Sequence, residues 1–378
     1  MAIETKRIYL SGVIVGSYRS QNIIKVLADA GIPFFLSPIT FHISSFFPRL
    51  LRRPFGYIAL ALTLPLRILF ILNSTHVIVL PMNWSKAVYL ELFFAKLFRK
   101  EIIVDYYISI YDTMVNDRKT ISVNSFSAKK LLFKDNLLLK LATKIIFLNK
   151  SESIYYQNIA KYQVNEDKVR IIPLVVDFKK ETFESITLYD NAPSDSNFNI
   201  CWWGTYIPLH GLENIIAAFE FLKGEKIILN VFGDSDLKSK PYVDLIKKLG
   251  VESNVKINNE YSFSNGKLAP FLIQNCNLAL GNFGQSEKAK TVLVNKLVDS
   301  LALGLPCLTI ETKATKELLN EGDGVIYTST TPSEIAKRIL ELSVDRSYLA
   351  TVGKNGFQMY LNKFSPDKFK TEFIKVFQ

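Results

Sequence analysis

Short apolar runs alternate with longer segments of helical periodicity along most of this chain. In the first half, strands are predicted at RIYLSGVIV, HVIVLP, EIIVDYY, KIIFLN and VRIIPLVV. The segments between them, such as QNIIKVLADAG and KAVYLELFFAKLFR, have the spacing of helices. Strands that alternate with helices are typical of parallel βαβ units, and strands as apolar as these are typical of a sheet buried on both faces.

One polar stretch interrupts this alternation. Residues 178–198 contain Pro193, Ser194 and Asp195, which indicates an inter-domain linker, and the alternation resumes at FNICWWG. The closing segment PDKFKTEFIKVF places Phe369, Phe373, Ile374 and Phe377 on one helical face. The sequence therefore predicts an α/β protein with two Rossmann-like, doubly wound domains. We expect them at residues 1–180 and 198–360, with a linker at 181–197 and a C-terminal helix at 361–378.

The charge balance narrows the classes of partner. The 378 residues carry a formal net charge of +11, which favours anionic partners such as phosphorylated small molecules, a membrane surface or nucleic acid. The cations are spread along the chain and form no block, so no nucleic-acid partner is expected. Three scattered cysteines and three scattered histidines predict reduced thiols and no metal site.

Residues 54–72 form the most apolar segment of the chain. Pro65 and Arg67 interrupt it, and Arg49, Arg52 and Arg53 precede it. No signal peptide and no membrane span are expected. Two interpretations remain open: a core helix of the first domain, or a helix that lies in an anionic membrane interface.

The stretch WWGTYIPLHGLENIIAAF, residues 202–219, is the first candidate for binding chemistry. A strand ends at Gly204, Gly211 follows, and a helix pattern begins. Such a turn presents backbone N–H groups to a phosphate, although it is equally typical of an ordinary strand-to-helix connection. There is no Lys or Arg between the two glycines. The chain has neither GxGxxG nor GxxxxGK[ST], which argues against a dinucleotide oxidoreductase and a P-loop NTPase.

A second cluster lies at residues 281–306. Gly281 and Gly284 follow a predicted strand, and Lys288 lies in the next loop. At the start of the helix after that, the chain has Asn295, Lys296 and Asp299. A lysine near a helix N-terminus suits a diphosphate, and a carboxylate one turn later suits ribose hydroxyls. The alternative is a solvated Lys–Asp pair on a helix surface.

A third cluster follows the strand that ends near Asp105. Residues Tyr111 and Asp112 come in the next loop, which we expect at the carboxyl edge of the sheet. Asp112 could act as a base or orient an acceptor, or it could cap the next helix.

The glycine loop GTYIPLHG and the helix DSLALGLP, taken together, resemble the GT-B glycosyltransferases, specifically glycosyltransferase family 4, over nearly the whole chain. RIIPLVVD and KELLNEGDGVIY are similar to further stretches of that family. The chain departs from the family pattern in three places. Thr205 and His210 stand where members have Arg and Lys, and the family's paired glutamates fall on Thr291 and Asp299.

The resemblance implies two Rossmann-like domains facing a central cleft, with the C-terminal helix crossing back to the first. It implies an enzyme that transfers a sugar, of hexosyl type, from a nucleotide-diphosphate sugar held by the C-terminal domain, without metal or cofactor. The expected donor contacts are Gly204, Thr205, His210, Gly211, Lys288, Asn295, Lys296 and Asp299, where Lys288 and Lys296 supply the cations that the glycine loop lacks. The expected catalytic residues are Asp112 and His210, and the expected acceptor contacts are Gly16, Ser17, Arg19, Tyr111 and Asp112.

The acceptor implied is a glycan or a lipid-linked glycan of bacterial surface polysaccharide biosynthesis. The protein is then expected in the cytoplasm, with peripheral contact at the inner face of the plasma membrane. Retention of anomeric configuration is implied by the family and left open by the missing glutamate. Two other functions remain open on the same fold: a nucleotide-sugar epimerase or hydrolase, and a non-catalytic scaffold with degenerate donor motifs.

Overall fold

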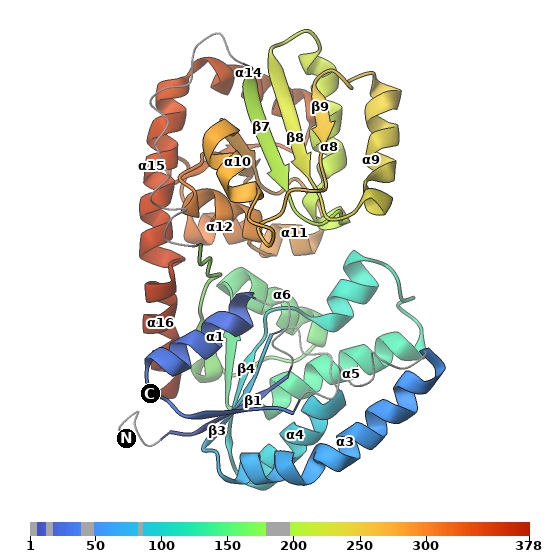
Figure 1. Ribbon diagram of the computed structural model, residues 1–378, viewed down its shortest axis with the longest axis vertical. Coiled ribbons are helices and arrows are strands. Elements are labelled where there is room, and N and C mark those ends of the chain that lie inside the picture. Colours follow the sequence, from blue (N-terminus) through green and yellow to red (C-terminus); the bar gives the residue numbers. More distant parts are fainter. Residues whose placement is uncertain (1–5, 13–17, 39–48, 82–85, 179–196) are drawn as a thin grey trace. The chain divides into compact units, whose positions relative to one another are not determined.

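The computed structural model describes residues 6–12, 18–38, 49–81, 86–178 and 197–378. The chain divides into two compact units. Unit 1 comprises Met1–Leu148, Tyr156–Ile172 and Lys370–Gln378, and unit 2 comprises Asn149–Tyr155 and Pro173–Phe369. Each unit is built on one six-stranded sheet (Figure 1).

The sheet of unit 1 is parallel throughout, in the order β2-β1-β3-β4-β5-β6. Its middle strands are almost wholly buried because helices cover both faces, which explains their continuous apolar character. The strands are β1 (Ile8–Ser11), β2 (Phe34–Leu36), β3 (His76–Val79), β4 (Glu101–Asp105), β5 (Lys144–Phe147) and β6 (Val169–Ile171). The helices of this half of the chain are α1 (Tyr18–Asp29), α3 (Arg49–Leu72), α4 (Lys86–Leu97), the π-helical turn η2 (Asp112–Asp117), α5 (Phe126–Leu141), α6 (Lys150–Ala160) and the 3₁₀ turn η3 (Glu166–Lys168).

The sheet of unit 2 is also parallel, in the order β12-β11-β10-β7-β8-β9. Its strands are β7 (Phe198–Trp203), β8 (Ile227–Phe232), β9 (Val255–Ile257), β10 (Leu278–Leu280), β11 (Cys307–Ile310) and β12 (Val325–Thr328). Its helices begin with η4 (Pro208–His210), α8 (Leu212–Ala218), η5 (Phe219–Leu222), α9 (Asp236–Leu249) and α10 (Leu268–Asn275). They continue with α11 (Glu287–Thr291), α12 (Asn295–Ala302), α13 (Lys313–Leu318), α14 (Pro332–Val344), α15 (Arg346–Lys363) and α16 (Pro366–Ile374).

The strand order of unit 2 fixes where a ligand can bind. β7 lies between β8 and β10, so the chain leaves β7 in one direction and returns to its other side at β10. In doubly wound sheets the loops at such a switch point diverge at the carboxyl edge and leave room for a ligand. The loops that begin at Gly204 and Gly281 are those two loops.

The C-terminal segment returns to unit 1, as expected. Lys6 donates a hydrogen bond to the carbonyl of Phe377, and Lys144 donates to the carbonyl of Val376. The rings of Phe373 and Phe377 are buried edge to face, with centroids 5.8 Å apart. Residues Lys375–Phe377 form a last 3₁₀ turn, η6. The apolar face predicted for this segment is therefore the face that packs.

The elements differ from the sequence prediction in a few places. The three-residue strand β2 and the long helix α15 were not predicted, and Asp112 begins a π-helical turn where a loop was expected. Before the C-terminal segment, unit 1 extends to Ile172. The predicted linker lies almost entirely outside the described residues. Among the described helices, none combines the length and the apolar character that crossing a bilayer requires.

Candidate functional site

Two loops interlock at the switch point of unit 2. Phe283 donates its backbone N–H to the carbonyl of His210 at 3.1 Å. Gly211 has a φ of 61°, and a Cβ there would lie 2.4 Å from the Phe283 carbonyl carbon. A Cβ on Gly284 would lie 2.1 Å from the carbonyl oxygen of Leu209. Glycine is needed at both positions because each backbone passes against the other loop.

Side chains from the loops after β8 and β9 and from α9 hold the first loop in shape. Asp234 accepts a hydrogen bond from the backbone N–H of Tyr206 at 3.1 Å, and the Tyr206 hydroxyl donates to Asn259 at 2.7 Å. The Tyr206 ring stacks between Trp202 and Tyr242, at centroid distances of 5.9 Å and 5.1 Å. The stacked rings of Trp202 and Tyr242 and the carboxylate of Asp234 therefore hold the turn after β7 through Tyr206.

Lys296 extends from the first turn of α12 to this loop. Its Nζ lies 4.0 Å from the centre of the Trp202 ring and 3.5 Å from the point that a Cβ of Gly204 would occupy. The side chain is 3% exposed, and within the described part of the chain Nζ has no hydrogen-bond partner. Burial lowers the pKa of Lys296 well below its usual value, and nearby Cys307 and Asp299 only partly offset this.

His210 approaches the same point beside Gly204. Its Nε2 is 3.8 Å from the point that a Gly204 Cβ would occupy, and its ring meets Trp202 edge to face. His210 is buried, and its Nδ1 has no hydrogen-bond partner among the described residues. Burial, followed by the charge of Lys296, lowers the pKa of His210 well below its usual value. Two basic side chains thus flank one glycine, and both are disposed to be neutral.

Asp299 lies one helical turn after Lys296. Its Oδ2 accepts a hydrogen bond from Nε1 of Trp203 at 3.0 Å. Burial raises the pKa of Asp299 to about 7, against the opposing effects of the Trp203 bond and of Lys296. The carboxylate still has acceptor capacity for a hydroxyl, because an ionised carboxylate accepts at both oxygens.

The other expected donor contacts lie on neighbouring elements. Lys288 is buried on α11, a short helix that Ser286 caps, and does not lie in a loop as expected. Thr205 and Asn295 are exposed, the first beside Gly204 and the second at the start of α12. The apolar stripe expected on α12 is confirmed, since Leu297, Val298, Leu301 and Ala302 are all buried. The assignment of all these residues to donor contact stays a prediction.

Two of the residues expected to act in unit 1, Arg19 and Asp112, are buried and make polar contacts. Nε of Arg19 donates to Asp105 at 2.7 Å, and Nη2 donates to the carbonyl of Ile172 at 3.1 Å. Burial raises the pKa of Asp105, and the adjacent Arg19 partly counters this. Gly16 and Ser17 lie outside the described residues. The structure therefore gives Arg19 a pairing partner within unit 1.

Asp112 is buried at the start of η2. Its Oδ1 accepts from Asn116 at 3.0 Å, while its backbone N–H donates to Ser109 at 3.0 Å. The next helix, α5, is capped by Ser125, so Asp112 is not that cap. The half-buried Tyr111 donates its backbone N–H to Asp135 at 3.0 Å. Burial raises the pKa of Asp135 to about 6, which makes it a titratable neighbour of Asp112 that sequence reasoning missed.

Three residues of the unit 2 site were also missed. Trp202, Trp203 and Asp234 were treated as strand and loop residues. The one available signal was the pair of tryptophans directly before Gly204, since adjacent strand residues point to opposite faces. One indole accordingly packs under Lys296 and the other bonds Asp299.

Known proteins are similar to this chain in sequence and in fold. The profile of a family described as glycosyl transferases group 1 matches residues 191–359, which include every residue of the unit 2 site. A capsular polysaccharide biosynthesis glycosyltransferase, CapM of Staphylococcus aureus, is 23% identical over 257 residues. That alignment spans 65% of this chain and 63% of CapM.

Solved structures match over the whole chain. HepE from Anabaena, in complex with UDP-glucose, has a TM-score of 0.64 at 14% identity and covers 98% of this chain and 99% of its own. WaaG, a glycosyltransferase involved in lipopolysaccharide biosynthesis, has a TM-score of 0.61 at 11% identity, with 98% of each chain covered. At such identities the likeness shows the fold. The chain therefore has the GT-B fold, and its residues 191–359 are similar to the group 1 glycosyl transferases.

Proposed function

We propose that this protein is a glycosyltransferase that moves a sugar from a nucleotide-diphosphate sugar to a glycan or lipid-linked acceptor. The observation that carries the proposal is the position of Lys296, a buried amino group placed against the backbone of Gly204 at the switch point of a parallel sheet. A diphosphate would give Nζ the anionic hydrogen-bond partner that it lacks among the described residues and would favour its protonation.

The donor contacts follow from the same site. The diphosphate would lie over Gly204 and the N-terminal end of α8, where backbone N–H groups and Lys296 face its oxygens. Lys288 would add a second cation. Thr205, Gly211 and Asn295 would contact the donor beside the diphosphate. Asp299 would accept hydrogen bonds from the ribose, with Trp203 holding its carboxylate in place.

The reaction needs stabilisation of a leaving group. The bond between the anomeric carbon and the phosphate oxygen breaks, and the nucleoside diphosphate leaves with an additional negative charge. Lys296 is placed to stabilise that charge in a site that is poor in water. His210, neutral in the free site, would donate a hydrogen bond or take up a proton as the charge develops.

The acceptor binds to unit 1 in this proposal. We place the acceptor hydroxyl near Tyr111 and Asp112, with Asp112 as its base or orienting group. The buried pair of Arg19 and Asp105 would then position the loop that follows β4. We also propose that the transferred sugar is a hexose, that its configuration is retained and that no metal takes part. Metal independence is supported by the two lysines at the donor site, which can neutralise a diphosphate without a cation from solution.

The biological setting is proposed from the relatives. CapM is named for capsular polysaccharide biosynthesis and WaaG for lipopolysaccharide biosynthesis. By analogy, this protein would act in the synthesis of a bacterial surface polysaccharide, in the cytoplasm, with peripheral contact at the inner face of the plasma membrane.

A thermal-shift screen of nucleoside diphosphates and nucleotide sugars tests the donor site. UDP is the first probe, because HepE was solved with it. We expect UDP to raise the melting temperature of the wild type and to leave Lys296→Ala and Asp299→Ala unchanged. Lys290→Ala is the matched control, since Lys290 is half exposed on α11 and pairs with Glu287. A normal shift in both site variants would refute the assignment.

The two other functions predict different products. An epimerase or hydrolase consumes the nucleotide sugar without an acceptor, whereas the proposed transferase needs one. A non-catalytic scaffold gives no shift with any member of the screen. Incubation of the stabilising nucleotide sugar with and without a membrane extract, followed by chromatography of the nucleotide, separates these outcomes.

A further inference from the structure

Helix α3 presents an apolar face to solvent. Its most exposed member is Leu62, with 77% of its surface accessible. The other large exposed side chains of this face follow helical spacing from it, at Ile58, Leu66, Leu69 and Leu72. Between them, Ala61 and Pro65 are also exposed. We call these seven residues the α3 face, which spans about 20 Å of helix.

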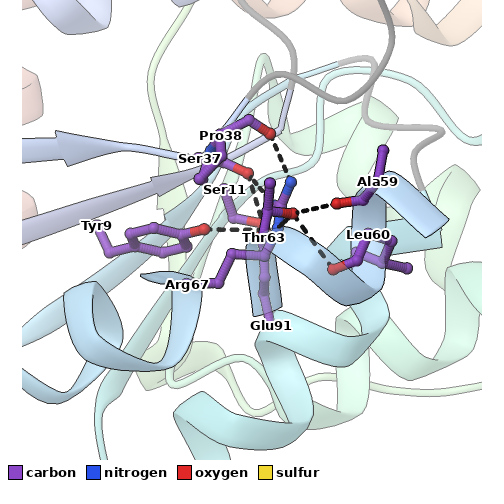
Figure 2. Close-up of polar contacts among 9 residues, drawn as sticks. All are labelled: Tyr9, Ser11, Ser37, Pro38, Ala59, Leu60, Thr63, Arg67 and Glu91. Atoms are coloured by element: carbon purple, nitrogen blue, oxygen red, sulfur yellow. Dashed lines mark hydrogen bonds and ion pairs between the residues drawn. The ribbon is translucent and has the colours of Figure 1, made fainter. Parts of the chain in front are cut away.

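The opposite side of α3 is tied to the unit 1 sheet by a polar network (Figure 2). Arg67 is 1% exposed and pairs with Glu91 of α4. Its guanidinium also donates to Ser37 and to the carbonyl of Pro38, while its Nε donates to Thr63 at 3.1 Å. This one cation in the apolar stretch therefore points inward and is neutralised.

Glu91 fixes the rotation of α3 about its axis. Besides Arg67, it accepts hydrogen bonds from Tyr9 and Ser37 at 2.8 Å and from Ser11 (Figure 2). On the same inner side, the ring of Phe70 stacks on that of Phe35 at 4.7 Å. Because these contacts are buried and directional, the helix cannot turn its leucines inward without breaking them. The buried contacts of α3 therefore keep the α3 face exposed.

The charges around the α3 face are almost all of one sign. Between residues 49 and 100 the chain has eight Lys and Arg residues and one acid, which is Glu91. Arg49, Arg52 and Arg53 begin α3, and Lys96 and Arg99 are exposed near the end of α4. Lys100 donates to the carbonyl of Leu72 at 2.8 Å, so this second group of cations lies at the far end of the α3 face. Figure 1 shows α3 and α4 together in unit 1, and the two helices pack on each other.

We infer that the α3 face, extended by Phe93 and Leu97 of α4, docks on an anionic lipid bilayer. The leucines would enter the boundary between headgroups and acyl chains, and Lys96, Arg99 and Lys100 at the far end would contact lipid phosphates. The helix lies on the bilayer and does not cross it, in agreement with its length and composition. This inference rests on the proposed function, because a lipid-linked acceptor would be met at that surface.

Vesicle binding by the full-length protein tests the inference. The vesicles contain three parts phosphatidylcholine to one part phosphatidylglycerol, and a second set contains phosphatidylcholine alone. We expect the wild type to co-sediment with the anionic vesicles and to bind the neutral ones at least about tenfold more weakly. Leu62→Glu with Leu69→Glu should weaken binding to the anionic vesicles by about tenfold or more, because two charges replace inserted leucines.

The matched control is Leu237→Glu on α9 of unit 2. Leu237 is 84% exposed, so it tests whether any surface leucine has the same effect, and we expect binding unchanged. A loss of binding in this control, or normal binding of the double variant, would overturn the inference. The melting temperature of the same samples without ligand reports folding, and its increase with UDP reports the state of the donor site. A protein that binds vesicles but no nucleotide contradicts the proposed function and leaves the docking surface standing.

The competing occupant of the α3 face is a second copy of the chain. Analytical ultracentrifugation without lipid decides this. The wild type could be a dimer that becomes monomeric in the Leu62→Glu, Leu69→Glu variant and could fail to bind vesicles. This result would show that the α3 face is an interface between two copies of the chain and that it does not dock on a bilayer.

Discussion

The ammonium nitrogen of Lys296 lies 4.0 Å from the centre of the Trp202 ring, in a site where it has no hydrogen-bond partner among the described residues. A cation over an indole face gains about 0.5–2 kcal/mol, whereas burying an ammonium costs several kcal/mol. Trp202 therefore offsets only part of the desolvation. The protonated form of Lys296 is therefore unfavourable in the free site, and a bound anion would stabilise it.

Replacing Lys296 by Met should separate stability from binding. Because Met keeps most of the volume and removes a buried amino group that has no hydrogen-bond partner among the described residues, we expect the free energy of unfolding to stay equal or to rise by about 1–2 kcal/mol. UDP affinity should fall by about tenfold or more. Denaturant unfolding and calorimetry measure the two quantities, with Lys290→Met as the control. A clear loss of stability with UDP binding intact would contradict this account of the site.

Nucleotide binding should take up protons. The pKa values of Lys296 and His210 are both lowered in the free protein, and a bound diphosphate should raise both. Protonation then accompanies binding, so UDP affinity should decrease as pH rises. Asp299 and Cys307 are the other titratable groups close to Lys296.

Calorimetry at about pH 8, where the diphosphate itself is fully ionised, can count those protons. The binding enthalpy is measured in two buffers with different ionisation enthalpies. We expect the two enthalpies to differ, and the difference to shrink in Lys296→Met. Equal enthalpies in both buffers would show that no proton is taken up.

Asp299 should make the free protein less stable as pH rises. The folded pKa is about 7, above the unfolded value of about 3.9, so the folded state binds more protons between these values. Stability therefore decreases with rising pH from about 4 to about 7. Asp299→Asn lacks this dependence, and its melting temperature relative to wild type should increase across that range.

The Trp203 bond gives a second check on the same carboxyl. It lowers the pKa of Asp299, so Trp203→Phe should raise that pKa further. The exposed Asp244 on α9 provides the control, since Asp244→Asn should follow the wild-type pH profile of melting. Parallel profiles for Asp299→Asn and wild type would show that the carboxyl titrates normally.

Glu91→Gln should destabilise unit 1. The substitution leaves the guanidinium of Arg67 buried without a counter-charge, and breaking a buried pair from one side costs about 3–5 kcal/mol. Thermal unfolding followed by circular dichroism measures the effect, with Glu101→Gln at the exposed start of β4 as the control. A loss no larger than that of the control would mean that the Glu91 network contributes little to stability.

The sequence predicted those parts of the molecule that depend on local pattern. The alternation of strands and helices in unit 2 and the buried stripe of α12 follow from periodicity, and both are confirmed. The bond between Trp203 and Asp299 joins residues 96 positions apart, and no local pattern contains that information. Strand β2 has three residues, which is too few to show an alternation.

The segment at α3 shows a different limit. In the sequence, Arg67 reads as an interruption of an apolar run. In the structure it is the residue that orients the helix, because its partner Glu91 lies on another helix. One side of this segment packs in the core, as the first interpretation expects, and the other side is exposed, while contact with a membrane stays a prediction.

The contacts of Gly211 and Gly284 with each other's loops bear on protein engineering. A chimera that imports the first loop from a relative, to change the donor sugar, would place a new backbone against residues 281–284. A lysine at position 210 of an imported loop would lie close to Lys296, beside Gly204. The exchangeable unit is therefore both loops together with the first turn of α12, and libraries that vary one of them alone would sample mostly misfitted sites.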